Sequence, residues 1–312
     1  MKHLLLALFA AATLQAQDTS LKDWLIDGED WRVAAEGYAF TDGLCCDKAG
    51  NLFFTDVKGG PGIFKIDVAT GKTSLVIDNL PGISGLQIGP DGRFYACHNK
   101  AQRIIAISAD GKQIDELLAD VKCNDLVVTA NGNLYFTETP TKRIHLIRPD
   151  KSHVIADEGS VSKPNGISVS PDQRTLAVSD YGGKNVWTWQ INDDGTLAAA
   201  APYMTMECPL APDQSGGAKP GERPANLPIY KPESAGDGMT TESNGRWFVT
   251  TALGVQVFDQ AGRLSGIFAK PTPDAKVVSV EFAGKDHDLL FIGAGDKIYS
   301  RKLKVKGFFG QK

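Results

Sequence analysis

One unit recurs six times along this chain: a small or polar residue, an alternating apolar strand, a turn with Asp, Asn or Gly, and a second apolar strand. The copies begin at Asp42, Ser84, Asn124, Asn165, Asp237 and Val278. Further strand patterns follow each copy, such as residues 62–67 after the first. Four short strands in every repeat of about 40 residues are typical of a β-propeller blade. The repeat therefore predicts an all-β fold, a six-bladed β-propeller.

The two ends of the repeat array predict how the ring closes. The last copy ends near residues 302–306 without room for a fourth strand, and residues 31–35 form a spare strand before the first copy. We expect this N-terminal strand to pair with the strand around residues 297–302. Such closure removes exposed sheet edges. The prediction is a single domain over residues 18–312, closed by an N-terminal strand.

The first residues have the pattern of a targeting segment. Lys2 and His3 precede an apolar run from Leu4 to Leu14, and the small residue Ala16 follows it. This order is typical of a secretory signal peptide, and the run is too short to span a bilayer. We expect residues 1–17 to be removed and the mature protein to be exported, either periplasmic or secreted. A buried N-terminal helix is the alternative.

Composition excludes several partners and scaffolds. The 33 basic and 37 acidic side chains give a net charge of −4, whereas a nucleic-acid binder is expected to carry a basic face. No second long apolar segment occurs, so no membrane span is expected. The five cysteines fit neither a zinc ribbon nor a thioredoxin motif. Buried thiols are the simplest interpretation, and a disulfide between distant cysteines is the alternative.

The first residue of each copy should lie where the innermost strand begins, so that the six form a ring around the channel. Asp42, Asn124, Asn165 and Asp237 bring two carboxylates and two amides into this ring. Strands tend to avoid Asp and Asn, and such groups are costly to bury without partners. One interpretation is that they are turn residues at strand entries. The other is a cation site with oxygen ligands only, which suits Ca²⁺ better than Mg²⁺ or Zn²⁺.

Several separated motifs carry a resemblance. They are Phe40-Thr-Asp-Gly43, residues 50–56, Asn124-Asp125, Pro164-Asn-Gly166 and Asp237-Gly238-Met239. In these motifs the chain resembles the SMP-30/gluconolactonase/LRE-like family over roughly residues 30–300. The resemblance implies a six-bladed propeller with one divalent metal in its channel, and hydrolysis of lactones or some phosphoesters. Carried over by position, it implies Asp42, Asn124, Asn165 and Asp237 as metal ligands and Asp237 as the catalytic base.

The chain departs from the family pattern at two positions. Asp42-Gly43-Leu44 stands where the family commonly has Glu-Gly-Pro, and Lys122 stands where gluconolactone-acting members tend to have Arg. The shorter carboxylate can hold a metal off centre, and lysine lacks the planar fork of arginine. Glu36 is a rival for the first ligand.

Substrate contacts are expected from the face where the inner strands begin. Lys122 and Asn124 come from the ring motif. His98, Glu138 and Tyr181 come from connections that return to the same face. An exposed loop histidine at position 98, and structural roles for Glu138 and Tyr181, are the alternatives.

The expected function is metal-dependent hydrolysis of sugar lactones or related esters. Ca²⁺, with Mg²⁺, Mn²⁺ or Zn²⁺ as alternatives, would polarise the carbonyl while Asp237 orients or deprotonates the attacking water. The expected partner is a small lactone or sugar-derived molecule. The alternatives are an exported sugar- or protein-binding propeller with a structural metal, and phosphotriester hydrolysis on the same scaffold.

The spacing between Asn165 and Asp237 leaves roughly 30 residues more than a blade requires. The excess lies at about 204–236, where prolines and glycines fit neither a helix nor a central strand. Loops of this length are usually functional or disordered. Because the segment leads into Asp237, we expect a lid over the channel mouth that selects substrate size. A surface excursion without function is the alternative.

Overall fold

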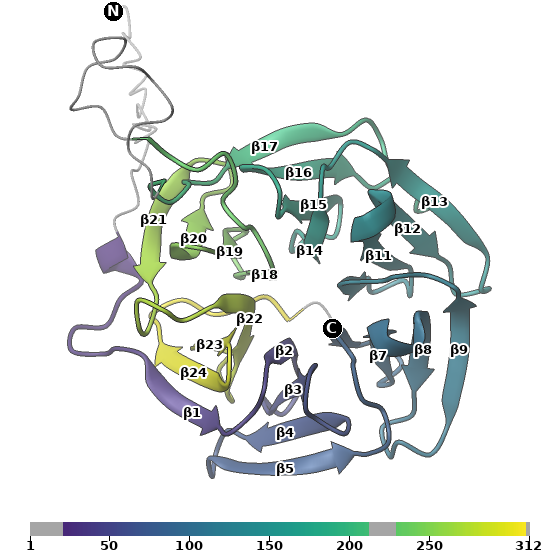
Figure 1. Cartoon of the computed structure of the whole chain (residues 1–312), viewed down its shortest axis with the longest axis horizontal. Helices are drawn as coiled ribbons and strands as arrows, with labels where there is room; N and C mark the ends of the chain where they lie inside the picture. Colours follow the sequence, from purple (N-terminus) through teal and green to yellow (C-terminus); the bar gives the residue numbers. More distant parts are fainter. Residues whose placement is uncertain (1–20, 212–228, 310–312) are drawn as a thin grey trace, which may run out of the picture.

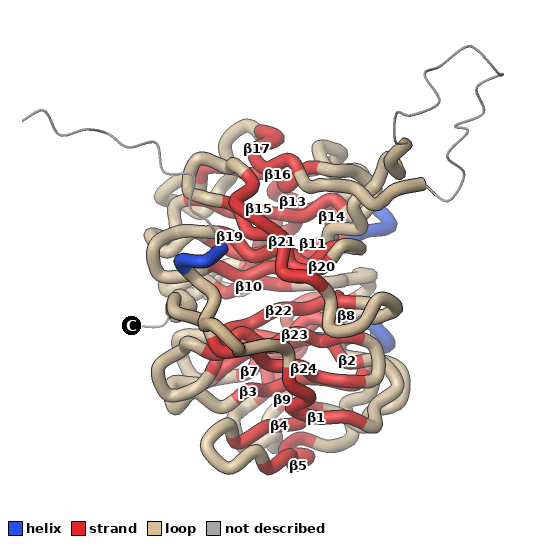
Figure 2. Tube along the Cα trace, turned by 90° about the vertical axis from the view of Figure 1, so that its left-hand side faces the viewer, coloured by secondary structure: helices blue, strands red, loops and turns tan. Residues whose placement is uncertain are grey.

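The structure, a computed structural model, describes residues 21–211 and 229–309. Within these ranges, 24 strands form six four-stranded antiparallel sheets. The sheets surround a central channel like the blades of a propeller (Figure 1). Seen from the side, the strands fill the body of the ring and the loops gather at its two faces (Figure 2). The predicted fold is confirmed, and the predicted signal peptide lies outside the described residues.

In blades one to five the strands follow chain order from the channel outward. Blades one and two contain β2 (Thr41–Cys46), β3 (Leu52–Asp56), β4 (Ile63–Asp67), β5 (Lys72–Ile77), β6 (Gly85–Ile88), β7 (Phe94–His98), β8 (Arg103–Ile107) and β9 (Ile114–Ala119). Blades three and four contain β10 (Leu126–Val128), β11 (Leu134–Glu138), β12 (Arg143–Ile147), β13 (His153–Glu158), β14 (Pro164–Val169), β15 (Thr175–Asp180), β16 (Asn185–Gln190) and β17 (Ala201–Thr205). Blade five contains β18 (Met239–Thr241), β19 (Trp247–Thr251), β20 (Gly254–Phe258) and β21 (Leu264–Ala269).

Helices contribute little to the described ranges. They are the three-residue 3₁₀ turns η1 (Leu21–Asp23), η2 (Asn99–Ala101) and η3 (Thr139–Thr141). Among the described residues, no helix has the length and apolar character needed to cross a bilayer.

Blade six joins the two ends of the chain. It contains β22 (Val277–Ala283), β23 (Leu289–Ala294), β24 (Lys297–Lys302) and, as its outer strand, β1 (Arg32–Glu36). Arg32 lies opposite Ser300 and Glu36 lies opposite Lys297. The purple β1 and the yellow β24 lie side by side in Figure 1. The predicted closure by an N-terminal strand is therefore confirmed.

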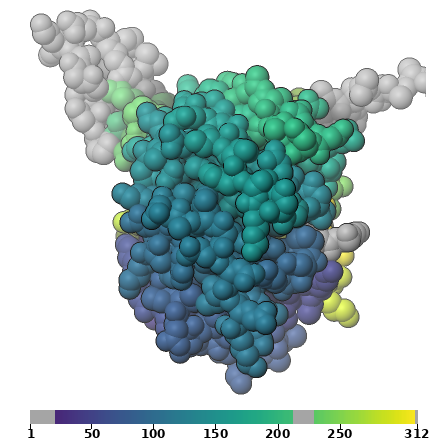
Figure 3. Space-filling model, turned by 90° about the vertical axis from the view of Figure 1, so that its right-hand side faces the viewer, coloured from purple at the N-terminus to yellow at the C-terminus, as the bar shows by residue number. Residues whose placement is uncertain are grey.

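The apolar core lies between neighbouring blades. Phe53 of blade one meets Phe94 of blade two edge to face, with ring centroids 5.0 Å apart. Phe248 of blade five meets Phe282 of blade six in the same way at 5.1 Å. On the side of the molecule shown in Figure 3, neighbouring blades meet in a continuous outer surface. A single repeat cannot bury its own apolar faces, which is the physical reason for the repetition in the sequence.

The cysteines belong to this packing. All five are free thiols; four are buried and Cys208 is partly exposed. Burial raises the pKa of Cys97 well above its usual value, which keeps that side chain a neutral thiol. The interpretation as buried thiols is confirmed for the four.

The described ends of the long connection are anchored beside blade four. Leu210 pairs with Tyr230. The hydroxyl of Ser234, which is fully buried, donates to the Gly183 carbonyl at 3.1 Å. The returning segment is thereby held where it leads into Asp237. Residues 212–228, the middle of the predicted lid, lie outside the described residues.

Candidate functional site

The six repeat-start residues occupy equivalent places at the entry of the inner strands. Asp42 lies opposite Thr55 in the ladder between β2 and β3. The backbone N–H of Asn124 donates to the backbone carbonyl of Thr137 at 2.8 Å. In blade five, the Asp237 amide donates to the Thr250 carbonyl at 2.9 Å. The ring that the repeat predicts is therefore present in the structure.

Hydroxyl groups of the second strands tie this ring together. The Thr137 hydroxyl donates to the Asn165 carbonyl of the next blade at 2.7 Å. The Ser179 hydroxyl donates likewise to the Asp237 carbonyl at 2.8 Å. Each bond joins a ring residue to the preceding blade through its backbone. Of the ring residues, Asp42 borders the channel and Asp237 borders the adjoining cavity.

The inner strands bulge at the ring. Thr137 pairs with two residues, because it accepts from the Asn124 amide and its own amide donates to the Asp125 carbonyl at 3.0 Å. Two residues opposite one define a β-bulge, which re-aims side chains. Blade five repeats the pattern with Asp237 and Gly238 opposite Thr250.

The second bulge residue lies against the next blade and is usually glycine. The four glycines at this position are Gly43, Gly85, Gly166 and Gly238. A Cβ on Gly166 would lie only 2.1 Å from the Asp237 carbonyl oxygen, so the close approach of two blades requires glycine there. Blade three has Asp125 instead, and its side chain lines the channel. Asp125 is not among the predicted ligands, although the motif Asn124-Asp125 contains it.

Three carboxyl groups consequently share the channel entrance. Burial raises the pKa of Asp42 to about 7. Burial, together with the negative charge of Asp42, raises the pKa of Asp125 to about 7. Burial and then the charges of Asp42 and Asp125 raise the pKa of Asp237 well above its usual value. A bound cation would relieve this mutual repulsion, because an opposite charge stabilises ionised carboxylates.

The donor atoms at the entrance fit a hard cation. Asn165 Oδ1 is buried and has no hydrogen-bond partner, and an unsatisfied buried acceptor is destabilising. Carboxylate and amide oxygens are the ligands that Ca²⁺ prefers. Among the described residues, no three His, Cys, Asp or Glu side chains form a group that could hold a metal by themselves. A cation here would therefore need amide oxygen, such as that of Asn165, beside the carboxylates.

A small polar channel continues from the entrance. It encloses about 90 Å³ and is bordered by Asp42 and Asp125 and by Glu281 of β22. Glu281 Oε1 accepts from the Phe282 amide at 2.6 Å and from the Thr240 hydroxyl at 3.3 Å. Burial raises the pKa of Glu281 to about 7. Glu281 is not among the predicted site residues. It is a single acidic residue within an apolar strand pattern, and such a pattern does not indicate a site.

A larger cavity opens beside Asp237. It holds about 480 Å³ and is bordered by Asp237, Tyr181 and Phe40. Lys270 and Lys276, in the connection between β21 and β22, also line it. Tyr181 is 41% exposed, so its side chain is accessible to a bound molecule. Tyr181 and Asp237 thus border one cavity, and a contact of Tyr181 with substrate remains a prediction.

The other predicted substrate contacts line neither cavity. Lys122 is exposed, while Glu138 is buried and its Oε1 accepts from the Lys122 amide at 2.9 Å. His98 is buried rather than exposed on a loop. Its Nδ1 accepts from Arg103 Nε at 3.3 Å, and its Nε2 lies 3.1 Å from the Pro81 carbonyl. Asn124 also lines neither cavity, and contacts of Lys122, Asn124, His98 and Glu138 with substrate remain predictions.

The rival first ligand lies far from the entrance. Glu36 is an exposed residue of the outermost strand β1, and its carboxylate pairs with Lys297 Nζ at 2.6 Å. Asp42, by contrast, borders the channel. The structure therefore favours Asp42 over Glu36 at the candidate cation site.

Fold and site together define a class of protein, six-bladed propellers with an oxygen-rich, carboxylate-lined channel entrance. The SMP-30/gluconolactonase/LRE-like region matches residues 40–295, so the chain belongs to this family. Among curated relatives, a lactonase drp35 from Staphylococcus haemolyticus strain JCSC1435 is 27% identical over 190 residues. That match covers 56% of this chain and 58% of the relative.

Solved structures share the fold at lower identity. A gluconolactonase from Xanthomonas campestris is 20% identical with a TM-score of 0.71, covering 88% of this chain and 90% of that one. The calcium-binding protein regucalcin from Agrobacterium tumefaciens strain C58 is 15% identical with a TM-score of 0.70, covering 90% of this chain and 96% of that one. These likenesses establish the propeller architecture.

Proposed function

We propose that this protein is a metal-dependent lactonase that hydrolyses the ring ester of a sugar lactone or a related ester. The observation that carries the proposal is the group of three carboxyl groups with raised pKa values, beside the unpartnered Asn165 Oδ1, at a channel entrance. The family and the names of its lactonase and gluconolactonase relatives support this reaction class. The calcium-binding relative supports Ca²⁺ as the ion.

The residues that would hold the cation are Asp42, Asn165 and Asp237, with Asn124 in direct contact or bound through water. When bound, Ca²⁺ would polarise the ester carbonyl and screen the carboxylates from one another. The Asp42 side chain is one methylene shorter than the family's glutamate, so its carboxylate would have less reach toward the cation.

The chain's own residues would then bind substrate and move the proton. The cavity of about 480 Å³ beside Asp237 is large enough for a small ring ester. Tyr181 would contact the ring from the cavity wall. Lys122 and Asn124, which line neither cavity, would bind oxygens only on the part of a substrate that extends beyond this cavity. The Asp237 carboxylate would accept a hydrogen bond from the attacking water and take its proton as the new bond to the carbonyl carbon forms. The ring C–O bond would then break, and the proton would pass to the leaving ring oxygen, which becomes the hydroxyl group of the open hydroxy acid.

The test is a panel of sugar lactones, simple lactones and phosphotriesters, assayed with Ca²⁺ and after chelation. We expect lactone hydrolysis that disappears with chelator and returns with Ca²⁺. Asp237→Asn should lower kcat/KM at least ~100-fold, since general-base catalysis contributes about 10²–10⁴. The exposed Glu36→Gln is the matched control and should retain wild-type rates.

Three outcomes would contradict the proposal. Hydrolysis of phosphotriesters alone would assign another reaction to this scaffold. Saturable binding of lactones or sugars without turnover would indicate a binding propeller. Full activity and full metal affinity in Asp237→Asn would remove Asp237 from the site.

A further inference from the structure

In four blades a titratable residue ends the second strand near the channel entrance, and in three of them it forms a hydrogen-bonded clamp. The last residue of the second strand is Asp56, His98, Glu138 or Asp180. In three of these blades its carboxylate accepts from the amide two residues before a ring residue. The bonds are Phe40 N to Asp56 Oδ1 at 2.8 Å, Lys122 N to Glu138 Oε1 at 2.9 Å, and Lys163 N to Asp180 Oδ1 at 2.9 Å. The clamp therefore sets where each segment enters the ring.

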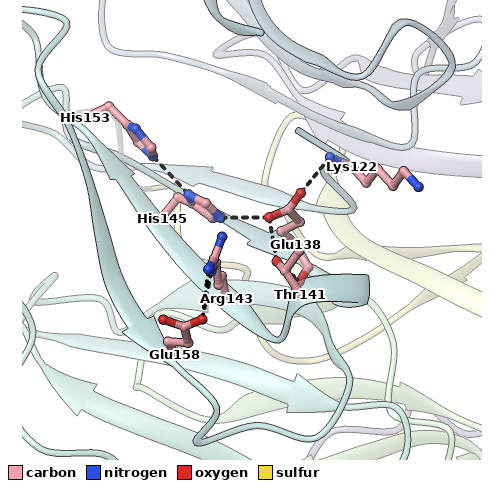
Figure 4. A network of polar contacts seen from close by, with 7 residues as sticks. All are labelled: Lys122, Glu138, Thr141, Arg143, His145, His153 and Glu158. Carbon is pink, nitrogen blue, oxygen red and sulfur yellow. Dashed lines mark hydrogen bonds and ion pairs between the residues drawn. The ribbon is translucent and has the colours of Figure 1, made fainter. Parts of the chain in front are cut away.

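Blade three extends this clamp to the outside of the molecule. Glu138 Oε2 lies 3.3 Å from His145 Nε2, and His145 Nδ1 lies 2.9 Å from His153 Nε2. Figure 4 shows the three side chains in a line, with Lys122 at one end and His153 at the other. His145 is buried, while His153 lies on the exposed outer strand β13. The line thus connects the surface of the blade to the backbone at the channel entrance.

The histidine pair is packed as well as hydrogen-bonded. The His145 ring stacks on Phe136, with centroids 4.4 Å apart and planes 5° apart. The His153 ring also stacks on the His145 ring, with centroids 5.2 Å apart. The nearby charges, Arg143 and Glu158, pair with each other at 2.9 Å. Stacking and hydrogen bonding together restrict the orientation of His145.

The protonation states set the direction of each hydrogen bond. Burial lowers the pKa of His145 to about 4, so the ring is neutral at pH 7 and carries one N–H. Although burial opposes it, hydrogen bonds from Thr141 and from the Lys122 amide hold the pKa of Glu138 below its usual value. An ionised Glu138 can only accept, so His145 Nε2–H donates to it. His145 Nδ1 then accepts from His153 Nε2–H.

A glutamate needs this support more than an aspartate does. Asp56 and Asp180 perform the same task with one rotatable bond fewer, so less rotamer freedom is lost when they are held.

We propose that Glu138 is a positioning residue, oriented by His145 and His153, that holds the segment bearing Lys122 and Asn124 at the channel entrance. The effect of Glu138 on catalysis rests on the proposed function. The effect of Glu138 on the position of the Lys122 backbone does not depend on that function.

The test compares two substitutions of His145. His145→Phe keeps an aromatic ring on Phe136 and removes both hydrogen bonds. His145→Gln retains a side-chain N–H that can donate to Glu138. His287→Gln is the control, because His287 also stacks on a phenylalanine, Phe309, but in another part of the molecule.

Hydrogen exchange of the Lys122 amide is the first measurement. We expect about tenfold faster exchange in His145→Phe, the size of losing a well-ordered hydrogen bond to a charged acceptor. His145→Gln and His287→Gln should exchange within about twofold of wild type. Unchanged protection in His145→Phe would overturn the proposal. If that variant does not fold, His153→Phe on the exposed strand serves instead, and unchanged protection there would likewise overturn it.

Steady-state kinetics on a lactone is the second measurement. We expect KM to rise about fivefold in His145→Phe with kcat within about twofold, as for loss of uniform substrate binding, and His145→Gln to restore KM. Faster exchange with unchanged KM and kcat would overturn the catalytic consequence. If wild type hydrolyses no lactone while exchange still responds, the proposed function fails and the positioning role stands.

Discussion

The carboxyl groups at the channel entrance are held close together at a cost in stability. Asp42 and Asp125 have folded-state pKa values of about 7, far above those of exposed aspartates. They take up protons on folding at pH values between about 4 and 7. The proposed cation site would account for the retention of such groups, since a bound cation would replace the protons.

Stability of the metal-free protein should therefore fall as pH rises. Between about pH 4 and 7 the folded state binds more protons than the unfolded chain, so the free energy of unfolding decreases with pH. Asp42→Asn should reduce this decrease by up to about 4 kcal/mol, since about three pKa units at ~1.4 kcal/mol each are removed. Urea unfolding in chelator at several pH values measures it. Equal pH dependence of the free energy of unfolding in wild type and Asp42→Asn would contradict the raised pKa of Asp42. Added Ca²⁺ should make the wild-type free energy of unfolding less dependent on pH.

The inner strands owe their geometry to the bulge at the ring. Gly166 does not have the positive φ that favours glycine, yet a Cβ there would meet the Asp237 carbonyl. The glycine is therefore required by the approach of blade five and not by its own conformation. The same bulge points Asp125 toward the channel in blade three.

Gly166→Ala should destabilise the protein by roughly 2–4 kcal/mol, because the clash involves backbone of the next blade and cannot be relieved by a rotamer change. Gly92→Ala is the comparison. It has φ of +79° but open space around the added methyl, so about 1–2 kcal/mol is expected. Denaturant unfolding measures both. A smaller loss for Gly166→Ala than for Gly92→Ala would show that the blades can separate at little cost.

The ring as a whole depends on the pairing of its two ends. β1 supplies the outer strand of blade six, and Trp24 packs with Phe248 and Phe282 of blades five and six. The segment before blade one therefore stabilises the closure by both hydrogen bonds and apolar burial.

A chain that begins at residue 38 should lose this closure. Compared with a chain that begins at residue 21, we expect its melting temperature to fall by about 10 °C or more, since Trp24 burial and five strand residues are lost. Calorimetry checks the difference. Equal melting temperatures would mean that the blade-six edge is stable without β1.

Export remains a proposal about the chain as a whole. Expressed with residues 1–17 in a Gram-negative host, the protein should be recovered from the periplasm with an N-terminus near Gln17. Cell fractionation and intact mass of the purified protein measure this. Full-length protein in the cytoplasm would contradict it.

Repetition allowed much of the fold to be derived from the sequence alone. The place of Asp42, Asn165 and Asp237 within their repeats is a local property, so their equivalence follows from spacing without knowledge of contacts. Closure by residues 31–35 follows in the same way from counting strands. Burial of Cys45, Cys46 and Cys97 agrees with the apolar strands that contain them.

Other features depend on contacts between distant segments. Asp125 enters the channel because a bulge, needed where two blades approach, breaks the period-two alternation of the strand. His98 is buried because the segment at Pro81 packs over it, and Glu138 reaches His153 only through the pairing of three strands. A one-dimensional pattern carries the period of a strand but not the distance to its neighbour, and this distance decides which side chains meet.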